Sequence, residues 1–492
     1  MRHIKEIFNH KDLSFIDDEY DNFLQKKETY LQNKTSSNYL ELTFAYELID
    51  AYLKSTLSDG YITLNELQYR MNLNKHITKT LLNEYAGSEK KKTVLMDDGN
   101  KYLLKFLDPT REKGRDLSYI NNAISEHISC SIYNIIGIPA QKTILGEYVD
   151  ENGKTKIACA CQDVRKNGEM MYEINKLELS SLDNTHAKKL SLPYMDEVFN
   201  KMDDIISKEQ LSDFYYEMFI IDAFIGNTDR HNGNWALLQS SDGIRISPVY
   251  DCGSSLAPLV DESTVSSDAG MDCAMNTSSV LVDDKGKRIK YCEFFKSELS
   301  PKTQKALLQI VPKINLDAID KLVFNTEYIS RNRQDFYFSF LHTTYEKILI
   351  PAIEKCFAQP ENSFADLAPD KCYDFYKTII RPLKENANYQ KQSLSFIGLN
   401  DYQYSKGGKS RIFIYKNEDI VGIISSRSNN RETRENYAIL SSFGLNIEKT
   451  IKSIKIEQEK AKHIQEEKSK IEISKDEEFN YDNSSYDDLE EK

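Results

Sequence analysis

Two carboxylates and an amide near the middle of the chain have the types and the order that phosphoryl transfer requires. Asp229 is followed five positions later by Asn234, and Asp251 comes 22 positions after Asp229. Phosphoryl transfer uses one carboxylate to orient the acceptor hydroxyl, and an amide and a second carboxylate to hold magnesium on the phosphates. The spacing therefore predicts a phosphotransferase site within residues 225–253.

The elements around this cluster should hold it rigidly. Upstream, apolar side chains recur mostly at three- and four-residue steps, which predicts a buried helix face; they are Leu211, Phe214, Tyr215, Met218, Phe219 and Ile225. Downstream, the apolar stretch 235–238 and the turn 240–243 predict a hairpin. That hairpin would return Asp251 to the side of Asn234, where both reach one metal. A plain polar loop is the alternative, because turns commonly use these residue types.

A nucleotide site also needs a lysine for the phosphates and a carboxylate that holds the lysine. Lys105 is the only charge in the apolar run 102–106, so a strand would hold it firmly. Glu126 lies in a helix predicted over 119–136, with isoleucines around it, and could face the interior and pair with Lys105. Two alternatives stay open: an edge-strand lysine facing solvent and a solvated acid on the helix surface.

A short loop before the lysine strand could cradle phosphate. Residues 86–93 are small and then basic, directly before the strand predicted at 94–96. Backbone amides around Gly87 could bind phosphate oxygens. The segment has neither the G-x-x-x-x-G-K-[ST] nor the G-x-G-x-x-G pattern. The prediction of a phosphate-binding loop therefore rests on the position of this segment before Lys105.

The order of the elements predicts an α+β fold with two lobes. Short strands dominate residues 80–175, whereas residues 176–358 are mainly helical apart from the hairpin. We expect a helical N-terminal extension at 1–79 and a small α/β module at 359–445, with a hairpin over 412–424 and a helix over 431–443. Residues 446–492 predict a charged helix that ends near residue 474 and a disordered acidic tail.

Composition narrows the class of protein. The net charge is −13, of which −6 comes from eight acids and two lysines in residues 475–492, and this balance disfavours nonspecific nucleic-acid binding. Of eight cysteines only Cys159 and Cys161 are close in the sequence. The sequence has no pair of C-x-x-C motifs, so a zinc ribbon is not predicted. The start lacks an apolar segment, and no run of about eighteen apolar residues occurs. We expect a soluble, cytoplasmic protein with reduced thiols and no membrane or nucleic-acid partner.

These segments together resemble the HipA-like serine/threonine protein kinases, including the free-standing bacterial members of that family. The matching residues are 85–91, 102–106, 125–127, 137–140, 226–234 and 250–253. The resemblance spans about residues 83–356, and the block from Asp229 to Asp251 is its specific part. The order Asp229-Arg230-His231-x-x-Asn234 also looks like the catalytic loop of phosphoinositide kinases. The resemblance implies a bilobal protein-kinase-like fold, with a small strand-rich N-lobe and a helical C-lobe.

The resemblance also implies roles at single positions, with ATP and Mg²⁺ as cofactors. Asp229 would be the catalytic base, Lys105 would contact the phosphates and Glu126 would brace that lysine. Asn234 and Asp251 would hold magnesium. A hinge would contact adenine through its backbone groups, and its residues are Cys161, Gln162 and Asp163. A loop would bind the phosphates, and its residues are Gly87, Ser88, Glu89, Lys90 and Lys91. His231 either supports the loop or the transition-state charge, or is a structural hydrogen-bonding histidine.

The predicted function is an ATP- and magnesium-dependent serine/threonine protein kinase. Two alternatives stay open: a lipid or small-molecule kinase, and a nucleotide-binding pseudokinase scaffold. The toxin of this family is autophosphorylated on a serine in its phosphate-loop region, but Asn83 and Glu84 stand before the loop here, and Ser88 is the substitute candidate. Residues 1–79 and 362–492 match no known module. Neither a protein substrate nor an antitoxin-like partner is therefore inferred.

Overall fold

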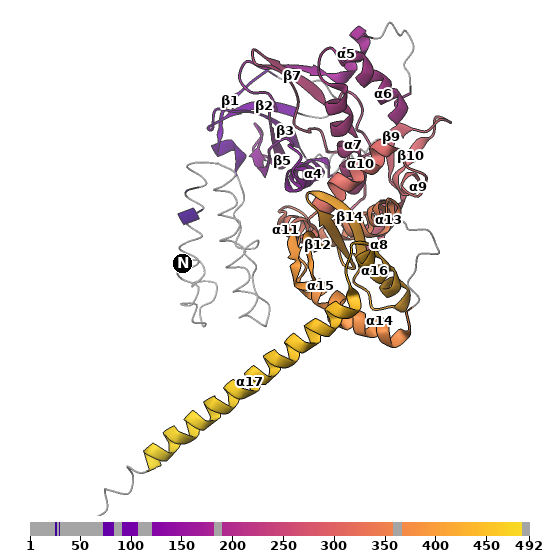
Figure 1. Cartoon of the computed structure of the whole chain (residues 1–492). Coiled ribbons are helices and arrows are strands. Elements are labelled where there is room, and N and C mark those ends of the chain that lie inside the picture. The colour runs from indigo at the N-terminus through magenta and orange to yellow at the C-terminus, as the bar shows by residue number, and fades with distance from the viewer. Residues whose placement is uncertain are drawn as a thin grey trace, which may run out of the picture. The chain divides into compact units, whose positions relative to one another are not determined.

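The computed structural model describes residues 25, 26, 29, 72–82, 91–106, 121–181, 189–357 and 367–484. The chain divides into two compact units (Figure 1). The first unit comprises residues 1–294 and 316–344, and the second comprises residues 295–315 and 345–492. All of the residues that the sequence assigns to catalysis or metal binding belong to the first unit.

A five-stranded antiparallel sheet forms the N-terminal part of the first unit, in the order β1-β2-β3-β5-β4. Its strands are β1 (Ile77–Thr80), β2 (Lys91–Met96), β3 (Lys101–Phe106), β4 (Thr143–Val149) and β5 (Thr155–Gln162). The predicted hairpin around residues 97–100 is confirmed as the β2–β3 pair. Strand β1 begins at Ile77, inside the range 1–79 expected to be helical; apart from residues 25, 26 and 29, the start of that range lies outside the described residues.

Alternation along β3 gives the sheet two different faces. Tyr102 and Leu104 pack into one apolar cluster with residues of β2, β4 and β5. Leu103 packs on the other face with Cys159 and Cys161. Lys105 must share this second face, because side chains of a strand point the same way at every second residue. The strand thus aims a charged side chain at the face that also receives the long helix α4 (Asn122–Ile136).

Helix α4 ends sharply and its end is tied to a distant segment. Gly137, with φ of 93°, donates its N–H to the carbonyls of Tyr133 and Asn134, as an αL helix cap does. Beyond it, the N–H of Val249 donates to the carbonyl of Pro139 at 2.8 Å, and the N–H of Gln141 donates to the carbonyl of Val249 at 2.7 Å. This pairing places the segment after Val249 directly beside α4.

The rest of the first unit is mainly helical and holds a small sheet, β6-β7-β8. Its helices and strands are β6 (Met170–Glu173), α5 (Ile174–Ser181), α6 (Leu192–Lys201), α7 (Lys208–Ile225), β7 (Ala236–Ser240), β8 (Gly243–Ile246), α8 (Ser267–Asn276), β9 (Ser278–Val282), β10 (Arg288–Lys290), α9 (Tyr291–Phe294), α11 (Leu316–Asn325) and α12 (Arg331–Thr344). The predicted helix before Gly226 and the hairpin after Trp235 are confirmed as α7 and β7–β8. Helices α8 and α12 pack closely, since a side chain at Gly270 would collide with the carbonyl of Phe336.

The second unit is built on a four-stranded antiparallel sheet, β11-β12-β13-β14. Its elements are α10 (Pro301–Ile310), η4 (Val311–Lys313), η5 (Tyr345–Leu349), α13 (Ile350–Lys355), α14 (Pro369–Phe375), η6 (Tyr376–Ile380), α15 (Arg381–Asn386), β11 (Gln392–Leu394), η7 (Ser395–Ile397), β12 (Leu399–Lys406), β13 (Arg411–Lys416), β14 (Asp419–Ser425), α16 (Asn430–Ser442) and α17 (Ile447–Ser484). The expected hairpin and helix are confirmed as β13–β14 and α16. Helix α13 joins this unit rather than the range 176–358, and Glu354 pairs with Arg411 of β13.

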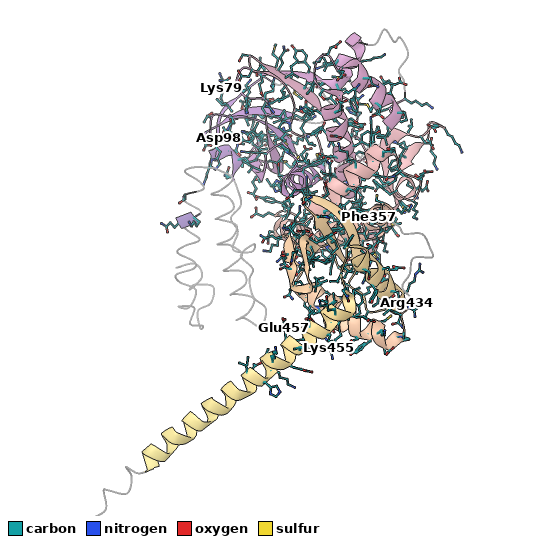
Figure 2. The ribbon with its side chains drawn as sticks, in the orientation of Figure 1. Lys79, Asp98, Phe357, Arg434, Lys455 and Glu457 are labelled. Carbon is teal, nitrogen blue, oxygen red and sulfur yellow. The ribbon has the colours of Figure 1, made fainter. Side chains whose placement is uncertain are left out.

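Helix α17 starts against the second unit and continues as one long helix (Figure 1). Ile447, Ile451 and Ile454 pack on its apolar cluster. Lys455, labelled in Figure 2, pairs with Asp374 at 2.6 Å. The expected end near residue 474 is wrong, because no glycine or proline interrupts residues 447–484. No helix among the described residues is long and apolar enough to cross a membrane.

Candidate active site

Lys105 connects two carboxylates that are far apart in the sequence. Its Nζ donates to Oε2 of Glu126 at 2.7 Å and to Oδ1 of Asp251 at 2.8 Å. The side chains of Lys105 and Glu126 are only 5% and 0% exposed, whereas that of Asp251 is 40% exposed. The strand β3, the helix α4 and the loop after β8 therefore meet at one ammonium group, with Asp251 on the open side.

The charges of this group reinforce one another. Burial alone would lower the pKa of Lys105, but the negative charges of Asp251 and Glu126 outweigh burial and hold the pKa well above its usual value. The positive charge of Lys105 in turn holds the pKa of Asp251 far below its usual range, and the charge of Lys91 adds to this effect. At neutral pH the lysine is thus charged and Asp251 is ionised.

The backbone around Asp251 is shaped to reach this position. Asp251 itself is left-handed, with φ of 57°, a conformation that non-glycine residues adopt rarely. The next N–H, that of Cys252, donates to Oε1 of Glu126 at 3.1 Å, so Glu126 holds both the lysine and the loop. A side chain at Gly253 would lie 3.2 Å from Oε2 of Glu126. Glycine at that position lets the loop approach α4 this closely.

The loop after α7 brings Asp229 and Asn234 together. Gly226, with φ of 65°, ends the helix, and a side chain there would collide with the ring of Phe340. The N–H of Asp229 donates to Oδ1 of Asn227 at 3.0 Å. The amide Nδ2 of Asn234 donates to the carbonyl of Asp229 at 2.7 Å, which leaves its Oδ1 as the atom that can accept from a ligand.

His231 lies next to the carboxylate of Asp229. Its Nδ1 accepts the N–H of Gly233 at 3.0 Å, so in a neutral ring the proton is on Nε2. That Nε2 lies 4.0 Å from Oδ2 of Asp229. Burial raises the pKa of Asp229, the charge of His231 opposes this rise, and the charge of Asp251 adds to it. His231 thus serves both as a hydrogen-bond partner within the loop and as a charge that acts on Asp229.

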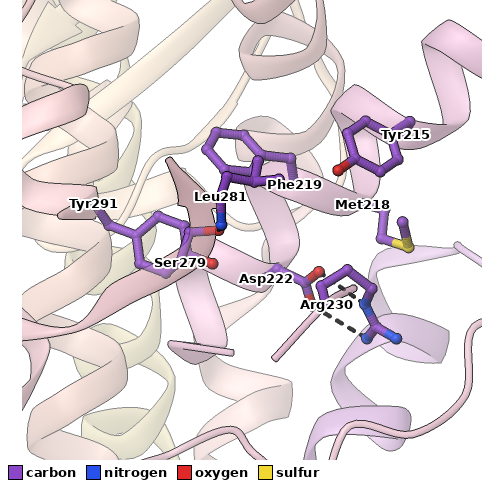
Figure 3. Close-up of a pocket in the computed structure, with 8 residues that line it drawn as sticks. All are labelled: Tyr215, Met218, Phe219, Asp222, Arg230, Ser279, Leu281 and Tyr291. Atoms are coloured by element: carbon purple, nitrogen blue, oxygen red, sulfur yellow. Dashed lines mark hydrogen bonds and ion pairs between the residues drawn. The ribbon is translucent and has the colours of Figure 1, made fainter. Parts of the chain in front are cut away.

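A buried ion pair that sequence reasoning did not single out organises the site. The guanidinium of Arg230 donates to the carboxylate of Asp222, on α7, at 2.9 and 3.2 Å (Figure 3). Its Nη1 also donates to the carbonyl of Asn234 at 2.8 Å and to that of Tyr250 at 2.6 Å. One side chain therefore fixes the residue that precedes Asp251 against Asn234. The sequence assigned this approach to the hairpin alone.

Asp222 collects further contacts from around the site. Oδ1 accepts from the hydroxyl of Tyr133, on α4, at 2.9 Å and from Nδ2 of Asn227 at 2.9 Å. Since α4 also carries Glu126, the helix that braces Lys105 is tied to the helix that leads into the catalytic loop. The sequence held a signal for this: Asp222 is the only charge in the apolar stretch 218–225.

The remaining predicted residues lie in three places. Lys91 pairs directly with Lys105 across β2 and β3, so both side chains lie on one face. Gln162 ends strand β5 and Asp163 follows it, and their N–H groups donate to the carbonyls of Lys142 and Lys101, both at 2.8 Å. Adenine would therefore have to meet other backbone groups of this segment. Four predicted phosphate-loop residues lie outside the described residues: Gly87, Ser88, Glu89 and Lys90.

The donor set fits a magnesium ion that is shared with phosphates. Asn234 offers an amide oxygen and Asp251 a carboxylate, and Mg²⁺ is usually bound by one or two such protein ligands together with phosphates and waters. Across the part of the chain that the structure describes, no cluster of three or more His, Cys, Asp or Glu side chains could hold a metal. A metal held by protein groups alone is thus not part of the described site.

Comparisons with known proteins show a family and a relative to which the chain is similar. The family model of the HipA-like C-terminal domain matches residues 79–318, a range that contains Lys105, Glu126, Asp229, Asn234 and Asp251. The serine/threonine-protein kinase CtkA of Helicobacter pylori (strain J99 / ATCC 700824) is 31% identical over 278 residues, which are 54% of this chain and 82% of that protein. A crystal structure of the Helicobacter pylori proinflammatory kinase CtkA is similar with a TM-score of 0.52 at 26% identity, and the match covers 59% of this chain and all of that one, 100%.

Proposed function

The chain belongs to the family of HipA-like kinases, and we propose that it transfers the γ-phosphate of ATP to serine and threonine hydroxyls of proteins. The observation that carries the proposal is the Lys105 ammonium that bridges Glu126 and Asp251 beside the loop of Asp229 and Asn234. A lysine and a carboxylate whose pKa values are shifted by specific charge partners mark a candidate functional site, and the carboxylate of Asp251 is 40% exposed. Protein kinases use a lysine paired with a glutamate, and an aspartate that binds Mg²⁺, at the ATP phosphates.

Each residue would act by position and charge. The carboxylate of Asp229 would accept a hydrogen bond from the acceptor hydroxyl and orient its oxygen toward the γ-phosphorus. Lys105, held by Glu126, would donate to phosphate oxygens, and Lys91 on the neighbouring strand would add positive charge on the same face. Arg230 contacts no substrate in this scheme, since it is buried and holds the two loop carbonyls.

Magnesium would be held by Oδ1 of Asn234 and the carboxylate of Asp251, together with ATP phosphates. When bound it neutralises negative charge on the transferring group. Asn234 is prepared for this role, because its amide nitrogen already donates to the carbonyl of Asp229. Oδ1 of Asp251 contacts Lys105, so the metal would share this carboxylate with the lysine. The buried pair of Lys105 and Glu126 would remain intact.

The cellular location of the protein, its partners and its autophosphorylation remain predictions. All eight cysteines are free thiols, which supports the expected cytoplasmic location. The acidic net charge of −13 supports the absence of a nucleic-acid or anionic-membrane partner. Autophosphorylation, with Ser88 as the candidate position, is part of the proposal, as is the identity of the acceptor as a protein rather than a lipid.

One experiment separates these functions. The full chain is incubated with MgCl₂ and γ-labelled ATP, in one reaction with a mixture of casein-like proteins and in another with phosphoinositide vesicles. We expect label on serine and threonine of protein, and none with the Asp229→Asn variant. Label in lipid alone would reject the protein-kinase proposal in favour of a lipid kinase. ATP binding without transfer to any acceptor, itself included, would indicate a pseudokinase.

A further inference from the structure

The hairpin of β9 and β10 is fastened to the catalytic loop at two consecutive residues. The hydroxyl of Tyr291, directly after β10, donates to the carbonyl of Asn227 at 2.7 Å. Nη2 of Arg288, at the start of β10, donates to the carbonyl of Thr228 at 2.8 Å. These two acceptors immediately precede Asp229. The hairpin therefore has a fixed place beside the carboxylate that would receive the acceptor hydroxyl.

The tip of this hairpin carries positive charge that is not neutralised within the described part of the chain. Lys285, Lys287 and Arg288 are exposed, and no carboxylate among the described residues pairs with them. The turn also holds two acids, Asp283 and Asp284. Oδ1 of Asp283 accepts the backbone N–H groups of Lys285 and Lys287 at 3.0 and 2.8 Å, so this carboxylate is held by the turn itself.

A fourth cation joins the tip from another segment. The N–H of Val282 donates to the carbonyl of Leu190 at 2.8 Å, so the chain before α6 runs along β9. A side chain at Gly286 would collide with Nζ of Lys189, which places that ammonium against the turn. We call the surface of Lys189, Lys285, Lys287 and Arg288 the basic hairpin. This cluster of four cations contrasts with the net charge of −13 of the whole chain.

The basic hairpin lies beside the carboxylate of Asp229. Arg288 donates to the carbonyl of Thr228 and Tyr291 to that of Asn227, the two residues before Asp229. An acceptor whose hydroxyl approaches Asp229 must bring its neighbouring residues close to this positively charged surface. Complementary charge at such a place increases the rate of encounter and selects between partners.

Resting on the proposed function, we propose that the basic hairpin docks the acceptor and selects serine or threonine residues flanked by aspartate or glutamate. An acidic peptide fits the surface better than the other anionic partners. The hairpin turn, residues 283–290, has no aromatic side chain on which a nucleic-acid base could stack. It also presents no large exposed apolar side chain that could enter a membrane surface.

The test uses two peptides that contain one serine and differ only in having Asp and Glu, or Asn and Gln, around it. With the full chain, we expect kcat/KM to be about tenfold higher for the acidic peptide, since each exposed ion pair contributes up to about fivefold. Arg288→Gln and the double variant Lys285→Glu/Lys287→Glu should remove most of this preference. Lys154→Glu makes one such charge reversal in the β4–β5 turn, away from the basic hairpin, and should leave the preference for the acidic peptide unchanged.

A charge-swap and a binding measurement complete the design. The double variant should prefer a peptide with lysines around the serine, which a merely structural role of the hairpin would not produce. Binding of a fluorescent acidic peptide, with alanine in place of serine, is measured by anisotropy and needs no phosphate transfer. Binding that the double variant reduces at least about fivefold supports the docking surface.

The outcomes separate this inference from the proposed function. Equal kcat/KM for the two peptides, with transfer intact, overturns the acidic selection and leaves the kinase proposal standing. Absence of transfer to every acceptor overturns the kinase proposal, and the anisotropy measurement then decides whether the hairpin binds acidic peptides. Tighter binding of RNA or of phosphatidylserine vesicles than of the acidic peptide, lost in the double variant, would overturn the peptide assignment.

Discussion

Nζ of Lys105 lies 2.8 Å from Oδ1 of Asp251, and this contact joins the proposed phosphate-binding residue to the proposed metal ligand. Of the charges that act on the pKa of Lys105, that of Asp251 has the largest effect, and of those that act on the pKa of Asp251, that of Lys105 has the largest effect. In this arrangement the lysine occupies the carboxylate that a metal would take. A Mg²⁺ ion bound with ATP, as proposed, would compete with Lys105 for this carboxylate, and the phosphates would offer the lysine further acceptors.

Lys105→Met should make Asp251 available to cations in the absence of nucleotide. At close range one unit charge contributes a few kcal/mol even at an effective dielectric constant of about 20, so Mn²⁺ alone should bind at least about tenfold tighter to the variant. Mn²⁺ binding is followed by electron paramagnetic resonance. Transfer of phosphate should fall sharply at the same time. Wild-type affinity for Mn²⁺ in the variant would show that Asp251 is not the metal ligand.

Substitutions at Asp229 and Asp251 should separate catalysis from nucleotide binding. Asp229→Asn should lower kcat about 10²- to 10⁴-fold, the usual contribution of a positioned acid or base, and leave the Kd for magnesium-ATP nearly unchanged. Asp251→Asn should lower kcat and also weaken magnesium-ATP binding, measured by calorimetry. Full activity in both variants would contradict the assignment of this site.

Breaking the buried pair of Asp222 and Arg230 should destabilise the first unit. Asp222→Asn leaves a guanidinium that is 5% exposed without its anion, which costs about 3–5 kcal/mol and lowers Tm by roughly 10 °C. Differential scanning calorimetry measures the change. Asp335→Asn, which removes an exposed partner of Arg331 on α12, is the matched control and should change stability by no more than about 1 kcal/mol.

Arg230→Lys should show whether the geometry of the arginine matters beyond its charge. A lysine keeps the positive charge, but it cannot bind the carboxylate of Asp222 with two nitrogens and still reach the carbonyls of Asn234 and Tyr250. We expect kcat to fall while the KM for ATP changes little, because Asn234 and the Tyr250–Asp251 segment lose their common support. Wild-type kcat would contradict this positioning role.

The pH profile should report the pair of His231 and Asp229. Asp229 acts in its ionised form, so activity is lost as the pH falls through its pKa, which burial raises above the ordinary value. The positive charge of His231 lowers that pKa. His231→Gln should therefore shift the acid limb of kcat/KM to higher pH. His76→Gln, on a histidine that pairs with Asp97 outside the site, should leave the limb in place.

The contacts of Glu126 show which interactions the local sequence predicts and which it does not. A single acid among isoleucines on a helix predicts a side chain that faces inward and seeks a cation, and the nearest apolar strand offered one lysine. The structure joins the two at 2.7 Å. The same reasoning could not find that Glu126 also accepts the N–H of Cys252, because backbone donors have no signature in the sequence.

The sequence by itself determined the β2–β3 and β7–β8 hairpins, the helix α4, the helix α7 and the two loops, since period, turn residues and helix ends are local properties of the chain. It also determined the residue types and spacing on which the family membership rests. Only the tertiary structure decided that Arg230 would hold Asn234 and Tyr250 together against Asp222, and that the basic hairpin would stand beside Asp229. These contacts join segments that are separate along the chain. Their free energy depends on burial and charge in the folded protein, which no local pattern encodes.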